Sequence, residues 1–189
     1  MKKFAYLLIL FAIQPTQSQS PDIEWQELIG GSANDYLYSL NMSNDDGYFL
    51  GGRSNSSISG DKNETGYGDY DYWVVKLSAD NVIEWQKTIG GTSDSGQTEF
   101  LTAGIACTDS GYLAAGYSNA EISGNKTEAC RGAFDYWIVK LSSTGNIAWQ
   151  KAYGGTFDDS LLDVKQTADD GFIMAGSSTS SISGEKSEN

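Results

Sequence analysis

Four short sequence patterns recur in the same order along this chain, with a period of about 60 residues. They are a tryptophan segment that ends in two glycines, a Gly-aromatic turn, an Ile-Ser-Gly loop that ends in lysine, and an Asp-Tyr-Trp segment. Chance similarity does not reproduce four patterns in one order, so the chain is a repeat protein. The copies are residues 23–31, 83–91 and 147–155; 46–48, 110–112 and 170–172; 58–62, 122–126 and 182–186; and 71–77 and 135–141.

Each repeat predicts four short strands, and no part of the repeats has helical periodicity. In the first repeat the strands are residues 37–43, 48–53, 72–77 and 82–89. An Asp-Gly turn joins the first two strands, because this pair tolerates the positive φ of a tight hairpin. The third strand is rich in β-branched and aromatic residues, and the fourth alternates apolar with polar residues.

Four antiparallel strands per repeat predict an all-β, β-propeller-like fold in which each repeat forms one blade. A β-sandwich would explain the strands but not the repeated patterns. The repeat domain covers residues 19–189, in repeats of about 24–83, 84–147 and 148–189, with the third truncated in its long polar loop. Propellers typically close with four to eight blades, so we expect a fragment of a longer protein or a subunit that must assemble. In a closed ring the leading strand, residues 23–26, would complete the last blade.

The first 18 residues are typical of a secretory signal peptide. Met1-Lys2-Lys3 is basic, residues 4–13 are apolar, and small polar residues follow. The apolar run is about half of the ~20 residues that a transmembrane helix needs. We therefore expect a secreted or cell-surface protein with no membrane span after cleavage.

Composition excludes several functions. The chain has no histidine, which rules out Ser-His-Asp catalysis and His-ligated zinc. Its 25 acidic and 12 basic residues give a net charge of −13, which argues against nucleic-acid binding. The sequence also contains no nucleophile elbow, phosphate-binding loop or cofactor motif. We therefore predict that the chain has no catalytic residues and is not an enzyme.

The combined patterns DYWVVKL, WQK followed by GG, DG-aromatic and ISG resemble a known repeat, over residues 22–189. It is the repeat of large secreted proteins of Bacteroidetes-type bacteria, which the type IX pathway often exports. The resemblance implies a β-propeller-like fold and an extracellular location, but it implies no activity. The chain departs from this family in having fewer repeats and no C-terminal sorting domain.

The loop that begins at Asp61 resembles the first half of a calcium-binding loop. Asp61, Asn63 and Asp69 occupy ligand positions, but Tyr72 stands where an EF-hand requires glutamate. Calcium is therefore a hypothesis beside the simpler interpretation of a polar, solvated loop. No other cofactor is predicted.

Cys107 and Cys130 are the only cysteines, and both lie in the second repeat. In an exported protein this favours a disulfide that ties the long loop to the first strand, with two free thiols as the alternative.

The sequence S/T-x-D-x-G at residues 43–47 and 167–171 resembles the Asp-box hairpin of sialidases. We interpret it as a turn-stabilising device, because the aspartate can hydrogen-bond its own backbone.

Tyr67 and Tyr70 lie in a polar, glycine-rich loop, where an aromatic side chain is a candidate for ligand contact. Packing within the loop is the alternative. We predict an exported binding module that contacts a glycan or a protein through the loops of one face, with self-association through open blade edges. The alternatives are a piece of a larger secreted propeller enzyme and a structural spacer of a surface protein.

Overall fold

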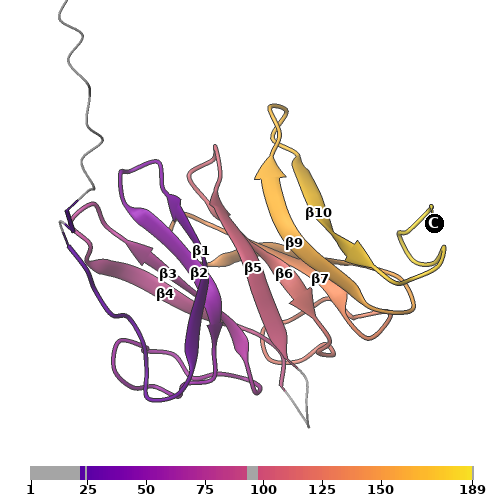
Figure 1. The fold of residues 1–189 in the computed structure, drawn as a ribbon, viewed down its shortest axis with the longest axis horizontal. Coiled ribbons are helices and arrows are strands. Elements are labelled where there is room, and N and C mark those ends of the chain that lie inside the picture. The colour runs from indigo at the N-terminus through magenta and orange to yellow at the C-terminus, as the bar shows by residue number, and fades with distance from the viewer. Residues whose placement is uncertain (1–21, 24, 93–97, 189) are drawn as a thin grey trace, which may run out of the picture.

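The computed structural model describes residues 22–23, 25–92 and 98–188 (Figure 1). This part of the chain is all-β and folds into three antiparallel sheets of four, four and two strands. Strand order follows the sequence within each four-stranded sheet, so every connection is a hairpin. The strands are β1 (Asp35–Met42), β2 (Tyr48–Ser54), β3 (Asp71–Leu77), β4 (Ile83–Ile89), β5 (Glu99–Ala106), β6 (Tyr112–Ser118), β7 (Asp135–Leu141), β8 (Ile147–Tyr153), β9 (Asp159–Gln166) and β10 (Phe172–Ser178).

The hairpin turns form as the sequence predicts. Asp46 has a φ of 62°, and the amide of Ser43 donates to the carbonyl of Gly47 at 2.9 Å. The Asp45 carboxylate accepts from the Ser43 hydroxyl at 2.5 Å and from the Gly47 amide at 3.2 Å. The turn-stabilising role of the Asp-box pattern is therefore confirmed.

The sheets stack face to face, and their hydrophobic cores lie between them. Sheet β1–β4 packs on sheet β5–β8 through Phe49, Tyr72 and Trp137, all of which are buried. The Tyr72 hydroxyl crosses this interface and donates to the carbonyl of Trp137 at 3.1 Å. Leu161 and Val164 of β9 cover the other face of the second sheet. The two largest cores therefore form between neighbouring repeats, and a smaller one lies on the outer face of the first sheet beside Ile29 of the leading segment.

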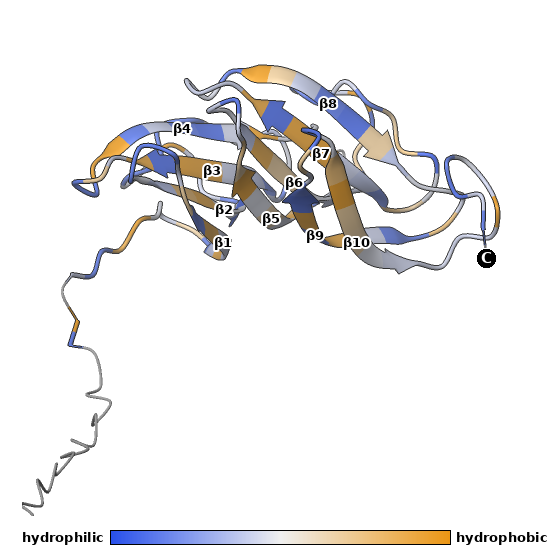
Figure 2. Ribbon diagram, turned by 90° about the horizontal axis from the view of Figure 1, so that it is seen from above, coloured by the Kyte–Doolittle hydropathy of each residue, from blue (hydrophilic) through white to orange (hydrophobic). Residues whose placement is uncertain are grey.

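The stack is fan-shaped. The first strands of neighbouring sheets are close, since β1 contacts β5 and β5 contacts β9. Figure 2 shows the fourth strands, β4 and β8, along the opposite side of the molecule. We call the side of β1, β5 and β9 the inner edge. Among the described residues no helix exists that is long and apolar enough to cross a membrane.

The leading segment differs from the expectation. Its described residues, 25–31, form no strand, although the homologous residues in the next repeats form β4 and β8. They lie instead against the outer face of sheet β1–β4, on which no other described sheet packs, over a largely apolar cavity of about 290 Å³. None of the described strands pairs with this segment, and a segment without a pairing partner takes an irregular backbone.

The packing of the leading tryptophan nevertheless follows the repeat. The ring centroids of Trp25 and Tyr48 are 6.0 Å apart. The equivalent pairs are Trp85 with Tyr112 at 5.4 Å and Trp149 with Phe172 at 6.2 Å. In all three pairs, a tryptophan that precedes a sheet in the sequence packs on an aromatic residue of that sheet, the first residue of its second strand. The signal-peptide prediction concerns residues 1–18, which lie outside the described residues.

Candidate binding site

The long loops of the three repeats lie at one end of the sheets, which we call the loop end. They are residues 55–70, 119–134 and 179–188. Neighbouring loops touch: the Asn125 amide donates to the Tyr67 hydroxyl at 3.3 Å, and Arg131 forms an ion pair with Glu185 at 2.5 Å. The three loops therefore form one continuous surface, as the sequence predicts for equivalent insertions of a repeat protein.

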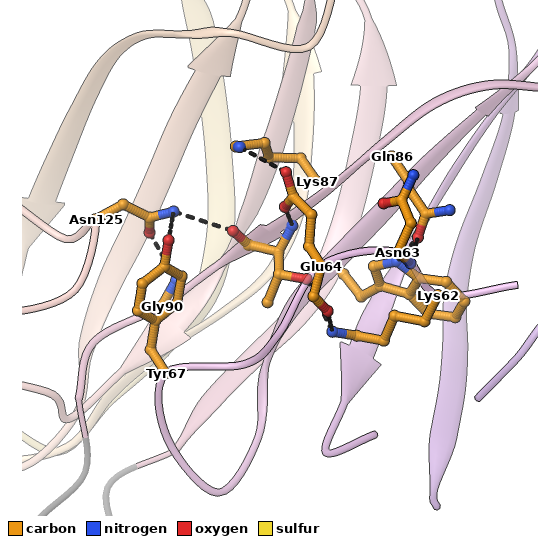
Figure 3. Close-up of polar contacts among 10 residues, drawn as sticks. Lys62, Asn63, Glu64, Tyr67, Gln86, Lys87, Gly90 and Asn125 are labelled. Atoms are coloured by element: carbon orange, nitrogen blue, oxygen red, sulfur yellow. Dashed lines mark hydrogen bonds and ion pairs between the residues drawn. The ribbon is translucent and has the colours of Figure 1, made fainter. Parts of the chain in front are cut away.

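A lysine organises each loop, and it is buried in the first two loops and half-buried in the third. The Lys62 side chain is 1% exposed, and its ammonium donates to the Glu64 carbonyl at 2.7 Å and to the Thr88 hydroxyl at 2.9 Å (Figure 3). Lys126 donates to the equivalent carbonyl, that of Glu128, whereas Lys186 donates to the carbonyl of Ser180 at the start of its loop. Burial lowers the pKa of the Lys62 ammonium, and the nearby carboxylates of Asp71, Asp35 and Glu64 oppose that shift.

This arrangement gives no support to the calcium hypothesis. Asp61 points back to the leading segment, where its carboxylate accepts from the Gly30 amide at 3.1 Å. The backbone amide of Asn63 donates to the Gln86 side chain at 3.2 Å. The Asp69 carboxylate forms no ion pair with any lysine or arginine of the described residues. The loop interior holds the ammonium of Lys62 where a cation would be expected. Within the described ranges no group of three or more His, Cys, Asp or Glu side chains could hold a metal ion.

Buried carboxylates stand at both contacts between sheets. Glu99 begins β5, accepts from the Gly91 amide at 3.0 Å and lies near Asp71 of the preceding sheet. Burial, together with the charge of Asp71, raises the pKa of Glu99 to about 8. Asp135 and Asp159 form the equivalent pair, and burial likewise raises the pKa of Asp135. These carboxylates are buried, so they belong to the contacts between the sheets and do not face an open binding site.

The two cysteines are free thiols, so the predicted disulfide is wrong. Cys107 is buried in the turn before β6, whereas the Cys130 sulfur contacts the Ser118 carbonyl at the end of β6, at 3.0 Å. The seven residues of β6 separate these points by about 20 Å at ~3.3 Å per residue. Burial raises the pKa of the Cys107 thiol to about 11 and also raises that of Cys130, so neither is an activated nucleophile.

The structure separates the two tyrosines that the sequence singled out. The Tyr67 hydroxyl accepts from Asn125, so Tyr67 joins the first two loops (Figure 3). Tyr70 lies at the inner edge, where its ring centroid is 6.0 Å from that of Tyr36. Its hydroxyl accepts from the Asn34 amide at 3.2 Å. Only Tyr70 belongs to a larger group of aromatic side chains.

That group surrounds a single guanidinium, and we call it the Arg53 cluster. The Arg53 guanidinium carbon lies 4.0 Å from the ring centroid of Phe100 and 4.6 Å from that of Tyr70. Tyr36 and Tyr38 follow at 5.1 and 5.9 Å. Phe100 stacks on Tyr117, which meets Phe134 edge to face, so the rings continue along the second sheet. The cluster comprises Arg53, Tyr36, Tyr38, Tyr70, Phe100, Tyr117 and Phe134.

The cluster is partly open to solvent. Tyr36 is 41% exposed and Tyr38 is 49% exposed, and their rings are almost parallel, with 14° between the planes and 6.1 Å between the centroids. Arg53, Tyr70 and Phe100 are half-buried beneath them. The inner edge at the loop end therefore presents two tyrosine faces and one cation, without a nucleophile or an open carboxylate pair among the described side chains around them.

Sequence reasoning predicted Tyr70 but not Arg53, Tyr36 or Phe100. The sequence feature that could have identified them is that their positions hold different residues in the three repeats. The position of Arg53 holds tyrosine and then serine in the next repeats, and that of Tyr36 holds phenylalanine and then serine. Scaffold positions such as Gly52 keep their residue in all three copies. Side chains that vary on a constant scaffold are candidates for ligand contact.

The chain was compared with models of known protein families and with curated proteins, and it matches none of them.

Proposed function

We propose that this chain is an exported, non-catalytic binding module whose repeats form consecutive blades of a β-propeller-like fold. Three observations favour blades: four-stranded antiparallel sheets, face-to-face stacking, and first strands that converge at the inner edge. The basic and apolar start of the chain favours export. The secreted Bacteroidetes-type repeat proteins remain the family that the sequence patterns resemble.

The ligand is proposed to bind at the Arg53 cluster and the adjacent loops. The observation that carries this proposal is the exposed tyrosine pair beside a half-buried cation. Binding sites typically combine aromatic and apolar surface with a few polar groups that fix orientation. Tyrosine suits such a surface because its ring packs on apolar groups while its hydroxyl stays hydrated.

Among ligand classes, a glycan fits this surface best. Sugar rings carry apolar C–H faces and a polar rim, which match the tyrosine faces and the hydroxyl groups around them. The test is a glycan panel screened against the mature protein, followed by calorimetry on each hit. Tyr36→Ala should weaken binding at least tenfold if a ring stacks there, which corresponds to about 1.4 kcal/mol.

A matched control uses another exposed aromatic residue. Phe157 is 58% exposed and lies outside the Arg53 cluster, in the third repeat. Phe157→Ala should leave every affinity unchanged. If neither substitution alters binding, or if a protein ligand binds and no glycan does, the proposed glycan site is wrong.

A further inference from the structure

Arg53 differs from the other basic residues in the described part of the chain in its contacts. Every other lysine and arginine in the described ranges has a hydrogen bond or an ion pair, but Arg53 contacts only aromatic rings. Its Nε is buried and has no acceptor. Among the carboxylates in the described part of this acidic chain, none forms an ion pair with this guanidinium.

Aromatic rings satisfy the guanidinium only in part. Cation–π attraction stabilises its charge, and Phe100 at 4.0 Å is well placed for that role. A guanidinium also carries five N–H donors in one plane, and a ring face supplies no acceptor comparable to a carboxylate oxygen. A planar carboxylate is the partner that this donor geometry fits best, through two parallel hydrogen bonds.

We propose that the ligand is a sugar ring that bears a carboxylate, such as a hexuronic acid. The inference rests on the proposed function, because it places the sugar at the Arg53 cluster. The ring would stack on Tyr36 or Tyr38, and the carboxylate would bind the Arg53 guanidinium beside them. The distance of 5.1 Å between the guanidinium carbon and the Tyr36 ring puts the two contacts within one monosaccharide.

Net charge favours a carboxylate over a phosphate or a sulfated polymer. With a net charge of −13, the protein repels anions at long range, and this repulsion grows with the charge of the ligand. A sugar with one negative charge can form the contact with Arg53 and is repelled less strongly by the acidic protein than a phosphate or a sulfated polymer. Phosphorylated sugars should therefore bind more weakly than the matching uronic acid.

The test compares D-glucuronate with D-glucose, which differ only at C6, by calorimetry on the mature protein. Glucuronate should bind roughly tenfold more tightly, as expected for one charge-assisted hydrogen-bonded pair. Arg53→Gln should remove this preference, so that the two sugars bind with similar affinity, whereas Tyr36→Ala should weaken both sugars and keep the preference. Arg53→Lys keeps the charge without the planar fork and should leave an intermediate preference, which covers the case in which Arg53→Gln does not fold.

The outcomes separate this inference from the proposed function. If glucose binds as tightly as glucuronate, or if Arg53→Gln keeps the preference, the carboxylate inference is wrong while the glycan site stands. Tighter binding of glucose 6-phosphate than of glucuronate would also overturn it. If neither sugar binds and the wider panel is inert, both proposals fail.

Discussion

The buried carboxylate at the joint between the first two sheets makes the stability of this protein pH-dependent. Glu99 has no exposed surface, and burial raises its pKa to about 8 from an ordinary value of 4.5. Between pH 4.5 and 8, the folded protein therefore keeps a proton on the Glu99 carboxyl that the unfolded chain has already released. The free energy of unfolding should fall as the pH rises through this window.

The size of the effect follows from the two pKa values. At 1.36 kcal/mol per pKa unit, the ionisation of Glu99 removes up to about 5 kcal/mol of stability by pH 8. This is a large share of the 5–15 kcal/mol that is typical of a folded domain. Glu99→Gln keeps an acceptor for the Gly91 amide and cannot ionise, so this variant should be more stable than the native chain at pH 8.

Urea unfolding, followed by tryptophan fluorescence at pH 5, 6, 7 and 8, measures this dependence. The window avoids Asp45 and Asp109, whose pKa values are lowered by hydrogen bonds and ion pairing and whose contribution is lost only in stronger acid. Stability of the native chain should decline towards pH 8, and that of Glu99→Gln should decline much less. Native stability that is constant or rises from pH 5 to pH 8 would refute the reasoning, as would equal slopes for both proteins.

Three further predictions concern the packing of the repeats. Gly90→Ala should lower stability by about 2 kcal/mol in thermal or urea unfolding, because its Cβ would overlap the buried carboxylate of Asp71. Alanine at this position without loss of stability would contradict the tight joint. Cys107 and Cys130 should both react with a thiol reagent once the protein is unfolded, and a reducing agent should not shift the melting temperature. A molecular mass of the unreduced protein that is lower by two hydrogens would instead reveal a disulfide. The exposed apolar area around Leu37 on the outer face of the first sheet should promote self-association, so Leu37→Glu should reduce any concentration-dependent increase in molar mass measured by light scattering.

The reason for self-association lies in the comparison of equivalent residues. Leu101 of β5 is fully buried under the first sheet, whereas its counterpart in β1, Leu37, is 57% exposed. The same face of the second sheet contributes Trp137 and Val139 to the core between the sheets. Their counterparts in the first sheet, Trp73 and Val75, are buried beside Ile29 of the leading segment, so the open apolar part of that face is the area around Leu37 and Leu40 of β1. Such an exposed apolar area is a natural contact surface for a further sheet.

Local sequence predicted the strands and the turns well. The third strand and the hairpin at Asp46 agree with the structure within a residue or two, because backbone conformation there depends on neighbouring residues. The same reasoning also predicted a strand at the leading segment, and its described residues 23, 25 and 26 form none. A strand needs a pairing partner, and pairing is a long-range property that local pattern does not contain.

The errors at the candidate sites share one physical cause. Cys107 and Cys130 belong to one repeat, but they lie near opposite ends of the same strand, which their presence in one repeat does not reveal. The loop at Asp61 has the oxygen-rich composition of a cation site, but its own lysine fills the interior. Arg53 and Phe100 meet across two repeats, so the cluster emerges only when the sheets stack.

The most direct measurement of the proposed binding site is a two-dimensional ¹H–¹⁵N NMR titration of the mature protein with ligands from the glycan screen. The largest amide shifts should fall on the start of β1, the end of β2 and the start of β5, around Arg53, with smaller shifts in the adjacent loops. Shifts confined to the turns at the opposite end, such as residues 43–47, or to the apolar cavity beside Trp25, would contradict a site at the Arg53 cluster.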